Sequence, residues 1–144
     1  MAYEITRVFI SFADTINRKP GVAANSVTGF SVQLPNYVEN AVFLELINAP
    51  TILNQAFIQL NDWGLSTTSK GKQYWRYVDE TSNNRSLDIE NSVKRHPVRL
   101  RTLDFTLFYA DGTPCEILFD ATTLQKGGFE LEIYSLNKEY NGHH

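Results

Sequence analysis

Glu130 and Glu132 are the two residues whose spacing most resembles catalytic machinery. They lie two positions apart in Gly128–Tyr134, a run that alternates with apolar residues, so both carboxylates project from one face of an expected strand. A retaining glycosidase needs carboxyl groups about 5 Å apart, whereas i and i+2 neighbours on a strand are separated by about 6.5–7 Å. The pair fits the solvated face of a strand better than an active site. We therefore expect no catalytic residues and no enzyme activity.

The residues that could bind a metal or a phosphate are also sparse. No second histidine or cysteine lies at ligand spacing from His96, and His143 and His144 stand together at the C-terminus. The single cysteine, Cys115, excludes an internal disulfide and any multi-cysteine zinc site. The loop Ser66–Lys72 lacks the spacing of a phosphate-binding loop. We expect no metal and no cofactor.

The densest basic cluster lies between residues 94 and 101. It could contact an acidic neighbour or nucleic acid, or it could be a strand entry whose alternate residues face water. The formal net charge of −3 and the pI near 5.6 make nucleic acid the less expected partner. Arg95 and Arg99 are candidate interface residues. The full cluster comprises Lys94, Arg95, His96, Arg99 and Arg101.

Aromatic residues form the second candidate for a recognition surface. Exposed aromatic rings stack on sugars and also anchor protein interfaces, although alternation along a strand predicts that about half of such a set is buried in the core. Trp63 lies in the turn Asp62–Gly64 and is expected to be exposed, and Trp75 lies between two tyrosines. The candidate residues are Trp63, Tyr74, Trp75 and Tyr77.

The elements that must position these residues read as strands throughout. The 144 residues fit one domain, residues 1–144, and no window shows the 3.6-residue period of a helix. Turn-forming residues make Asp14–Ala24 a long loop, and Asp62–Gly71 and Asp79–Asn91 also read as loops. The expected strands are Thr6–Phe12, Phe30–Leu34, Ala41–Ala49, Ala56–Leu60, Gln73–Val78, Leu103–Tyr109, Cys115–Phe119 and Phe129–Tyr134.

About eight antiparallel strands without a fixed repeat favour an all-β fold, a single jelly-roll β-sandwich in two sheets. The third strand, Ala41–Ala49, is apolar on both faces, which indicates either a central strand or one covered by a neighbouring subunit. Asp111–Pro114 is expected to form the turn after a core strand. No apolar run approaches the length of a transmembrane helix, and the first residues lack the pattern of a secretory signal, so we expect neither membrane insertion nor a secretory leader.

Both ends of the chain resemble one family. The segments that carry the resemblance are Val8–Phe12, Phe30–Pro35, Asn40–Pro50, Asp111–Pro114 and Phe129–Ile133. They are similar to the single jelly-roll penton and minor capsid proteins of large eukaryotic DNA viruses, virophages and polinton-like elements. The resemblance implies a structural protein of the virion, assembled inside the infected host cell. It also implies a symmetric oligomer, such as a pentamer, and contacts with other capsid proteins such as a major capsid protein.

A second function class remains open. A carbohydrate-binding β-sandwich would use exposed aromatic rings, and Trp63 together with the aromatic strand Gln73–Val78 offers such rings. A glycan array combined with Trp63→Ala distinguishes the two classes, since binding lost on that substitution would favour the glycan-binding module.

Overall fold

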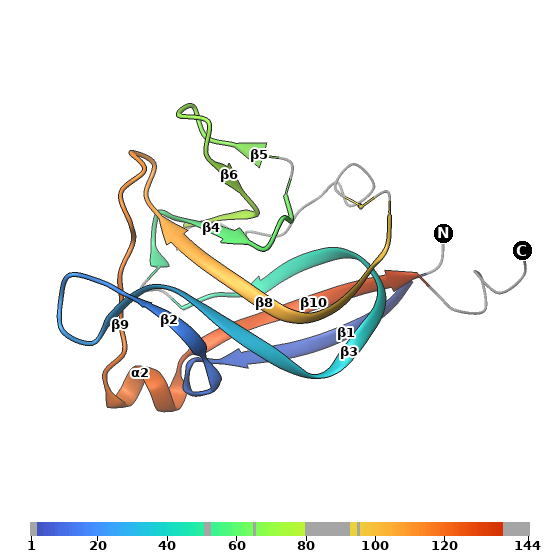
Figure 1. The fold of residues 1–144 in the computed structure, drawn as a ribbon, viewed down its shortest axis with the longest axis horizontal. Helices are drawn as coiled ribbons and strands as arrows, with labels where there is room; N and C mark the ends of the chain where they lie inside the picture. The colour runs from blue at the N-terminus through green and yellow to red at the C-terminus, as the bar shows by residue number, and fades with distance from the viewer. Residues whose placement is uncertain (1–2, 51–52, 65, 80–92, 95, 137–144) are drawn as a thin grey trace, which may run out of the picture.

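The computed structural model describes residues 3–50, 53–64, 66–79, 93–94 and 96–136. These residues confirm an all-β fold with one large, curled antiparallel sheet and a second sheet of two strands (Figure 1). The strands are β1 (Tyr3–Ser11), β2 (Ile16–Pro20), β3 (Ser26–Asn48), β4 (Ala56–Leu60), β5 (Ser66–Thr67), β6 (Gln73–Tyr74), β7 (Arg76–Val78), β8 (Val98–Phe108), β9 (Ile117–Leu118) and β10 (Gly128–Leu136). The helical elements are η1 (Phe12–Asp14) and α2 (Ala121–Lys126).

Hydrogen-bonded neighbours in the large sheet follow the order β1, β10, β3, β8, β4 and β7. β2 and β9 pair additionally with the beginning of β3. β1 and β10 pair without a register shift along their whole length, from Tyr3 opposite Leu136 to Ser11 opposite Gly128. In the described part of the chain β1 has no second partner, so it forms one edge of the sheet.

β3 spans two of the expected strands. It curves back on itself near the end of the molecule where β1 begins and β10 ends (Figure 1), so its first half pairs with β8 and its second half with β10. The expected strand Phe30–Leu34 ends before Pro35, yet Pro35 lies inside β3. It does so where the pairing with β8 is interrupted, between Gln33 and Val38. The missing N–H of proline therefore costs no ladder hydrogen bond.

Two other expectations about elements were wrong. The expected loop Asp14–Ala24 contains β2, whose five residues are all exposed. An edge strand with no buried face lacks the alternation by which strands are recognised in a sequence. The chain also contains α2, which has only six residues and buries none of them. It is too short to show a helical period, and the Asp120 side chain caps it by accepting the Thr123 N–H.

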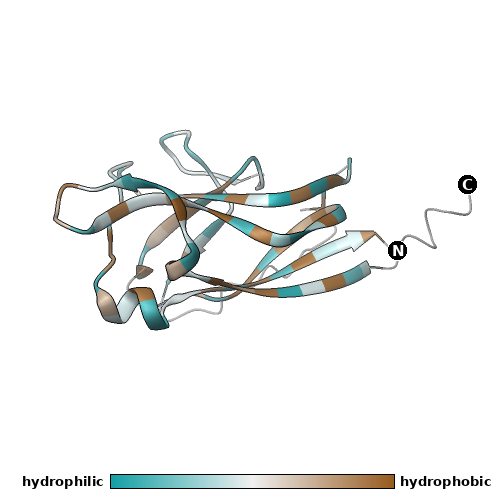
Figure 2. Cartoon of the chain, turned by 60° about the horizontal axis from the view of Figure 1, so that its bottom comes forward, coloured by the Kyte–Doolittle hydropathy of each residue, from teal (hydrophilic) through white to brown (hydrophobic). Residues whose placement is uncertain are grey.

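The core lies between two runs of strands that face each other (Figure 2). One run is β1, β10 and the second half of β3; the other is the first half of β3 with β8, β4 and β7. Aromatic rings from the two runs pack together. The ring centroid of Phe129 in β10 lies 5.2 Å from that of Phe105 in β8 and 6.1 Å from that of Phe30 in β3. Phe12 packs edge-on against both Phe30 and Phe129. Burial of such rings is a main source of stability in a core of this kind.

The sequence left open whether the strand Ala41–Ala49 is central or is covered by a neighbouring subunit. Val42, Phe43, Leu44, Glu45 and Leu46 are all buried within this single chain. This part of β3 is therefore a central strand, and its apolar faces require no neighbouring subunit to cover them.

The turn after β8 forms as expected. The Tyr109 N–H donates to Thr113 O, and the Asp111 carboxylate accepts from the Thr113 N–H at 2.9 Å and from its hydroxyl at 2.7 Å. Gly112 has a positive φ of 89°, a conformation that glycine adopts without strain. These hydrogen bonds hold the pKa of Asp111 below its usual range.

Candidate interaction surface

The two tryptophans lie inside the protein, contrary to the expectation that Trp63 is exposed. Each of them is only 4% exposed. The Trp63 N–H donates to Leu60 O at 2.9 Å, which turns the side chain back over the sheet, and Lys94 Nζ lies 4.7 Å from the ring centroid. Gly64, with φ at 100°, lets the turn pack directly on the backbone of Tyr74. A turn position alone did not reveal this packing.

Trp75 has an equally definite structural role. It interrupts the expected strand Gln73–Val78, separating β6 from β7, and its indole N–H donates to Leu44 O at 2.9 Å. Arg76 lies 5.1 Å from the Trp75 ring and donates to the same carbonyl at 3.0 Å. Burial lowers the pKa of Arg76, and Glu45 at 3.5 Å opposes that shift. Trp75 thus ties β3 to β7.

Of the two candidate arginines, Arg99 is exposed, whereas Arg95 lies outside the described residues. The Arg99 guanidinium carbon lies 3.7 Å from the centroid of the Tyr37 ring, and its Nε donates to Glu39 Oε1 at 2.7 Å. Arg101 approaches the same ring at 5.1 Å. We call Tyr37, Glu39, Arg99 and Arg101 the Tyr37 surface.

Tyr37 is the exposed aromatic residue of this cluster, at 48%. Sequence reasoning missed it because Tyr37 lies between the expected strands Phe30–Leu34 and Ala41–Ala49 and was assigned to neither. The signal was available, since an aromatic residue directly after a Pro-Asn bend leaves the regular alternation. An exposed aromatic ring in contact with guanidinium groups is the type of residue that anchors protein interfaces.

A hollow of about 440 Å³ extends from the Tyr37 surface toward Trp63. Asp62 lies at its edge, where its carboxylate is 3.2 Å from Lys94 Nζ. Asp104 also lines the hollow and accepts a short hydrogen bond from the Ser31 hydroxyl. Acidic and basic side chains therefore both line the hollow, and complementary charges of this kind give specificity to a contact between proteins.

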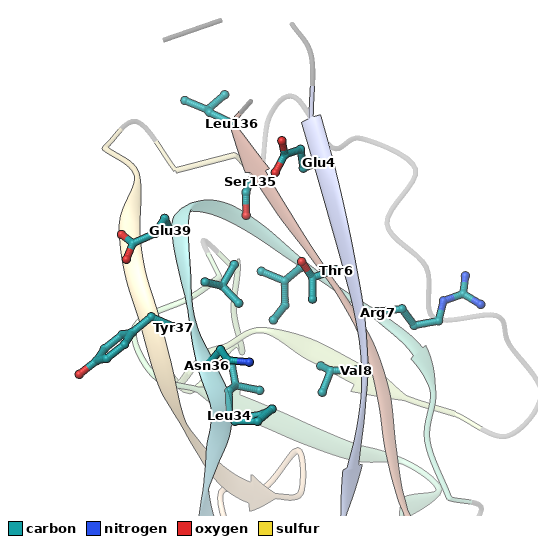
Figure 3. Close-up of a pocket in the computed structure, with 13 residues that line it drawn as sticks. Glu4, Thr6, Arg7, Val8, Leu34, Asn36, Tyr37, Glu39, Ser135 and Leu136 are labelled. Atoms are coloured by element: carbon teal, nitrogen blue, oxygen red, sulfur yellow. The ribbon is translucent and has the colours of Figure 1, made fainter. Parts of the chain in front are cut away.

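A second cavity, of about 400 Å³, lies behind the Tyr37 surface (Figure 3). Its walls are β1 and β10 on one side and the bend of β3 on the other. Leu34, Val8 and Ile133 supply apolar surface, and Glu4, Thr6 and Ser135 supply polar atoms. Tyr37 and Glu39 of the Tyr37 surface also line this cavity.

The outer face of β10 corrects another expectation. Glu132 was expected on a plain solvated face, but it is only 7% exposed. Arg7 donates to its carboxylate at 2.7 Å, and this contact raises the pKa of Arg7. The Tyr134 hydroxyl donates to the other oxygen at 3.4 Å, and Glu130 accepts from the Asn48 amide at 2.7 Å. Both carboxylates are thus held by neighbouring side chains.

The remaining sequence candidates are dispersed. Tyr74 and Tyr77 pack against Phe57, with ring centroids 4.9 Å and 4.7 Å away, on the outer face of β4. His96 is exposed, and His143 and His144 lie outside the described residues. Cys115 is buried, and burial raises the pKa of its thiol. Within the described ranges no three potential metal ligands come together.

The chain matches no protein-family model and no curated protein sequence. The helices of the described residues include none long and apolar enough to cross a membrane. Fold topology and surface geometry are therefore the basis for a functional proposal.

Proposed function

We propose that this chain is a structural subunit of a viral capsid, a penton or minor capsid protein, built as a single jelly roll. The order of its strands carries the proposal. In an eight-stranded jelly roll the first strand pairs with the last, the last with the third and the third with the sixth. The second pairs with the seventh, the seventh with the fourth and the fourth with the fifth.

The pairings of this chain support that order when the two halves of β3 count as the second and third strands. β1 pairs with β10, β10 with the second half of β3, and the Lys94 N–H donates to Val42 O of that half at 2.8 Å. The first half of β3 pairs with β8, β8 with β4, and β4 with β7.

Assembly is further supported by surfaces that a monomer leaves open. The Tyr37 surface presents an aromatic ring that lies against two guanidinium groups. Ile5 and Phe9, on the outer face of the edge strand β1, are each more than half exposed. Exposed apolar and aromatic side chains of this kind favour protein contacts. The proposed partners are further copies in a symmetric oligomer, such as a pentamer, and a major capsid protein.

The location that follows is the virion, after assembly in the host cell. Nucleic acid is not among the proposed partners, because two cations of the basic cluster are already paired with carboxylates: Arg99 with Glu39, and Lys94 with Asp62. Phosphate binding would have to compete with these carboxylates.

Electron microscopy of particles that contain the chain tests the proposal. A penton predicts five copies around each five-fold axis, and a minor capsid protein predicts copies at other defined positions under or between major capsid subunits. Absence of the chain from every particle formed beside a co-expressed major capsid protein contradicts the proposal.

The glycan-binding alternative has lost its two tryptophans, although Tyr77 of the aromatic strand is exposed. Both tryptophan rings are buried, so neither offers a face on which a sugar could stack. A glycan array with the wild type and Trp63→Ala distinguishes the two functions. We expect no binding in either, whereas binding by the folded wild type would favour the glycan-binding module.

A further inference from the structure

The cavity between β1, β10 and the bend of β3 contains an unsatisfied buried polar atom. Ser135 is 5% exposed, and its hydroxyl has no hydrogen-bond partner among the described residues. Figure 3 shows this hydroxyl directed into the cavity. A buried hydroxyl without a hydrogen-bond partner destabilises a fold. We therefore expect a ligand atom or an ordered water molecule to form a hydrogen bond with the Ser135 hydroxyl.

Two further acceptors lie beside Ser135. Glu4 is directly opposite Ser135 in the antiparallel register of β1 and β10, so their side chains point to the same side of the sheet. Thr6 follows two positions along β1 and shares that face. Figure 3 shows the oxygen atoms of all three facing the cavity. Within the described ranges no cation pairs with Glu4.

Apolar side chains from both walls also line the cavity. Leu34 and Ile133 belong to the buried core, and Val8 and Val38 pack against it. The cavity volume of about 400 Å³ falls at the lower end of the roughly 300–1,000 Å³ found for small-ligand sites. A fitting group must therefore combine a slim aliphatic body with a polar head.

The charge of the head follows from the acceptors. A carboxylate and two hydroxyl oxygens favour a cation over an anion, and a compact ammonium has three donors, one for each of them. A guanidinium is planar and binds best to a single carboxylate through two parallel hydrogen bonds. It therefore fits three separate acceptors less well than an ammonium does.

We propose that this cavity binds an alkyl-ammonium group, with the ammonium between Glu4, Thr6 and Ser135 and the alkyl stem against Leu34, Val8 and Ile133. Two sources share this chemistry: a lysine side chain on another polypeptide, and a free alkyl amine or polyamine. The proposal does not depend on the capsid function, because the purified chain alone should bind the group.

Nuclear magnetic resonance titration of the purified chain with n-pentylamine, at constant pH and ionic strength, tests the site. We expect shifts in the backbone amides of Glu4, Thr6 and Ser135, and much weaker shifts with n-pentanol, which has the same stem but no charge. Equal affinity for the amine and the alcohol overturns the proposal, as does a set of shifts that lies elsewhere.

Three variants make the test specific. Glu4→Gln should weaken n-pentylamine binding about fivefold, the upper range for an exposed ionic contact. Ser135→Ala should also weaken it while leaving the melting temperature equal or higher, because it removes an unpaired buried hydroxyl. Glu130→Gln, on the outer face of β10, is the matched control and should change nothing. A folded Glu4→Gln variant with wild-type affinity contradicts the site.

The source of the group is decided by two further probes. If Nα-acetyl-lysine methylamide binds more tightly than n-pentylamine, and its shifts extend along the open edge of β1, the site takes a lysine of another polypeptide. If spermidine binds more tightly than both, the site takes a free polyamine. Failure of all three amines to bind overturns the inference without affecting the assembly proposal.

Discussion

The two tryptophans and Tyr37 each have an aromatic ring in contact with a cation, but the tryptophans are buried and Tyr37 is exposed. Trp63 and Trp75 are almost completely buried, and cations lie over both rings from within the chain. The Tyr37 ring also lies against cations, but nearly half of it is exposed. Aromatic–cation stacking therefore does not identify an interaction surface here. What differs is the backbone: Trp63 is folded back by a turn, whereas Tyr37 stands on the outside of a bend.

The comparison assigns stability to the tryptophans and assembly to the Tyr37 surface. Variants of the first group should unfold the protein, and variants of the second should leave it folded. The stability of single variants in each group tests whether the two roles are separate.

Replacement of Trp75 should have the largest effect. Trp75→Ala removes a buried ring and its hydrogen bond to Leu44 O, and we expect the free energy of unfolding to fall by about 3–5 kcal/mol. Chemical denaturation measures this change. Tyr77→Ala, in the next strand and partly exposed, is the control and should cost far less. Similar losses for both variants would contradict a special role for Trp75.

The turn that buries Trp63 offers a matched pair of glycine variants. At Gly64 a Cβ would lie 2.4 Å from Tyr74 O, whereas at Gly112 nothing lies within 4 Å, although both have positive φ. Gly112→Ala should cost about 1 kcal/mol through backbone strain alone, and Gly64→Ala more, about 2–3 kcal/mol. Thermal unfolding compares the two. Equal losses would show that close packing at Gly64 does not hold the Trp63 turn.

The hydrogen bond between Glu116 and Val22 lies away from the Tyr37 surface and gives a pH-dependent prediction. The Glu116 carboxylate accepts from the Val22 N–H at 2.8 Å, and this contact holds the pKa of Glu116 below its usual range. A depressed pKa means that the contact stabilises the fold above the unfolded-state pKa and is lost as the pH falls through the folded-state pKa. Glu116→Gln should therefore increase hydrogen exchange at the Val22 amide near neutral pH. The difference from wild type should vanish in acid; a difference that persists there would contradict the ionic origin.

The smallest effect on stability is expected at the Tyr37 surface. The pair Arg99–Glu39 is exposed on both sides, and such pairs contribute about 0–1 kcal/mol. Arg99→Ala and Tyr37→Ala should accordingly change the melting temperature little. A large loss of stability in either variant would mean that the Tyr37 surface is part of the framework.

The fold was predictable wherever a strand has one buried face. β4 has the predicted bounds Ala56–Leu60, because its residues alternate between buried and half-buried positions. β2 could not be found, since none of its residues is buried. The bend of β3 was hidden because the sequence shows a proline but not the change of pairing partner that accommodates it.

The candidate surface was only partly predictable. Arg99 belonged to a visible basic cluster, but its partners Glu39 and Tyr37 lie some sixty residues earlier in the chain and meet it only through the pairing of β3 with β8. The burial of Trp63 likewise depends on Lys94, which is distant in sequence. Contacts of this kind come from topology, which local pattern does not contain.

Light scattering of the purified chain after size-exclusion chromatography tests the central claim, assembly through exposed surfaces, most directly. The wild type should give the mass of a defined oligomer, and Arg99→Glu, which opposes Glu39 with a second carboxylate, should give a folded protein of lower mass. A wild type that is strictly monomeric, and that joins no particle when mixed with a major capsid protein, would contradict the account.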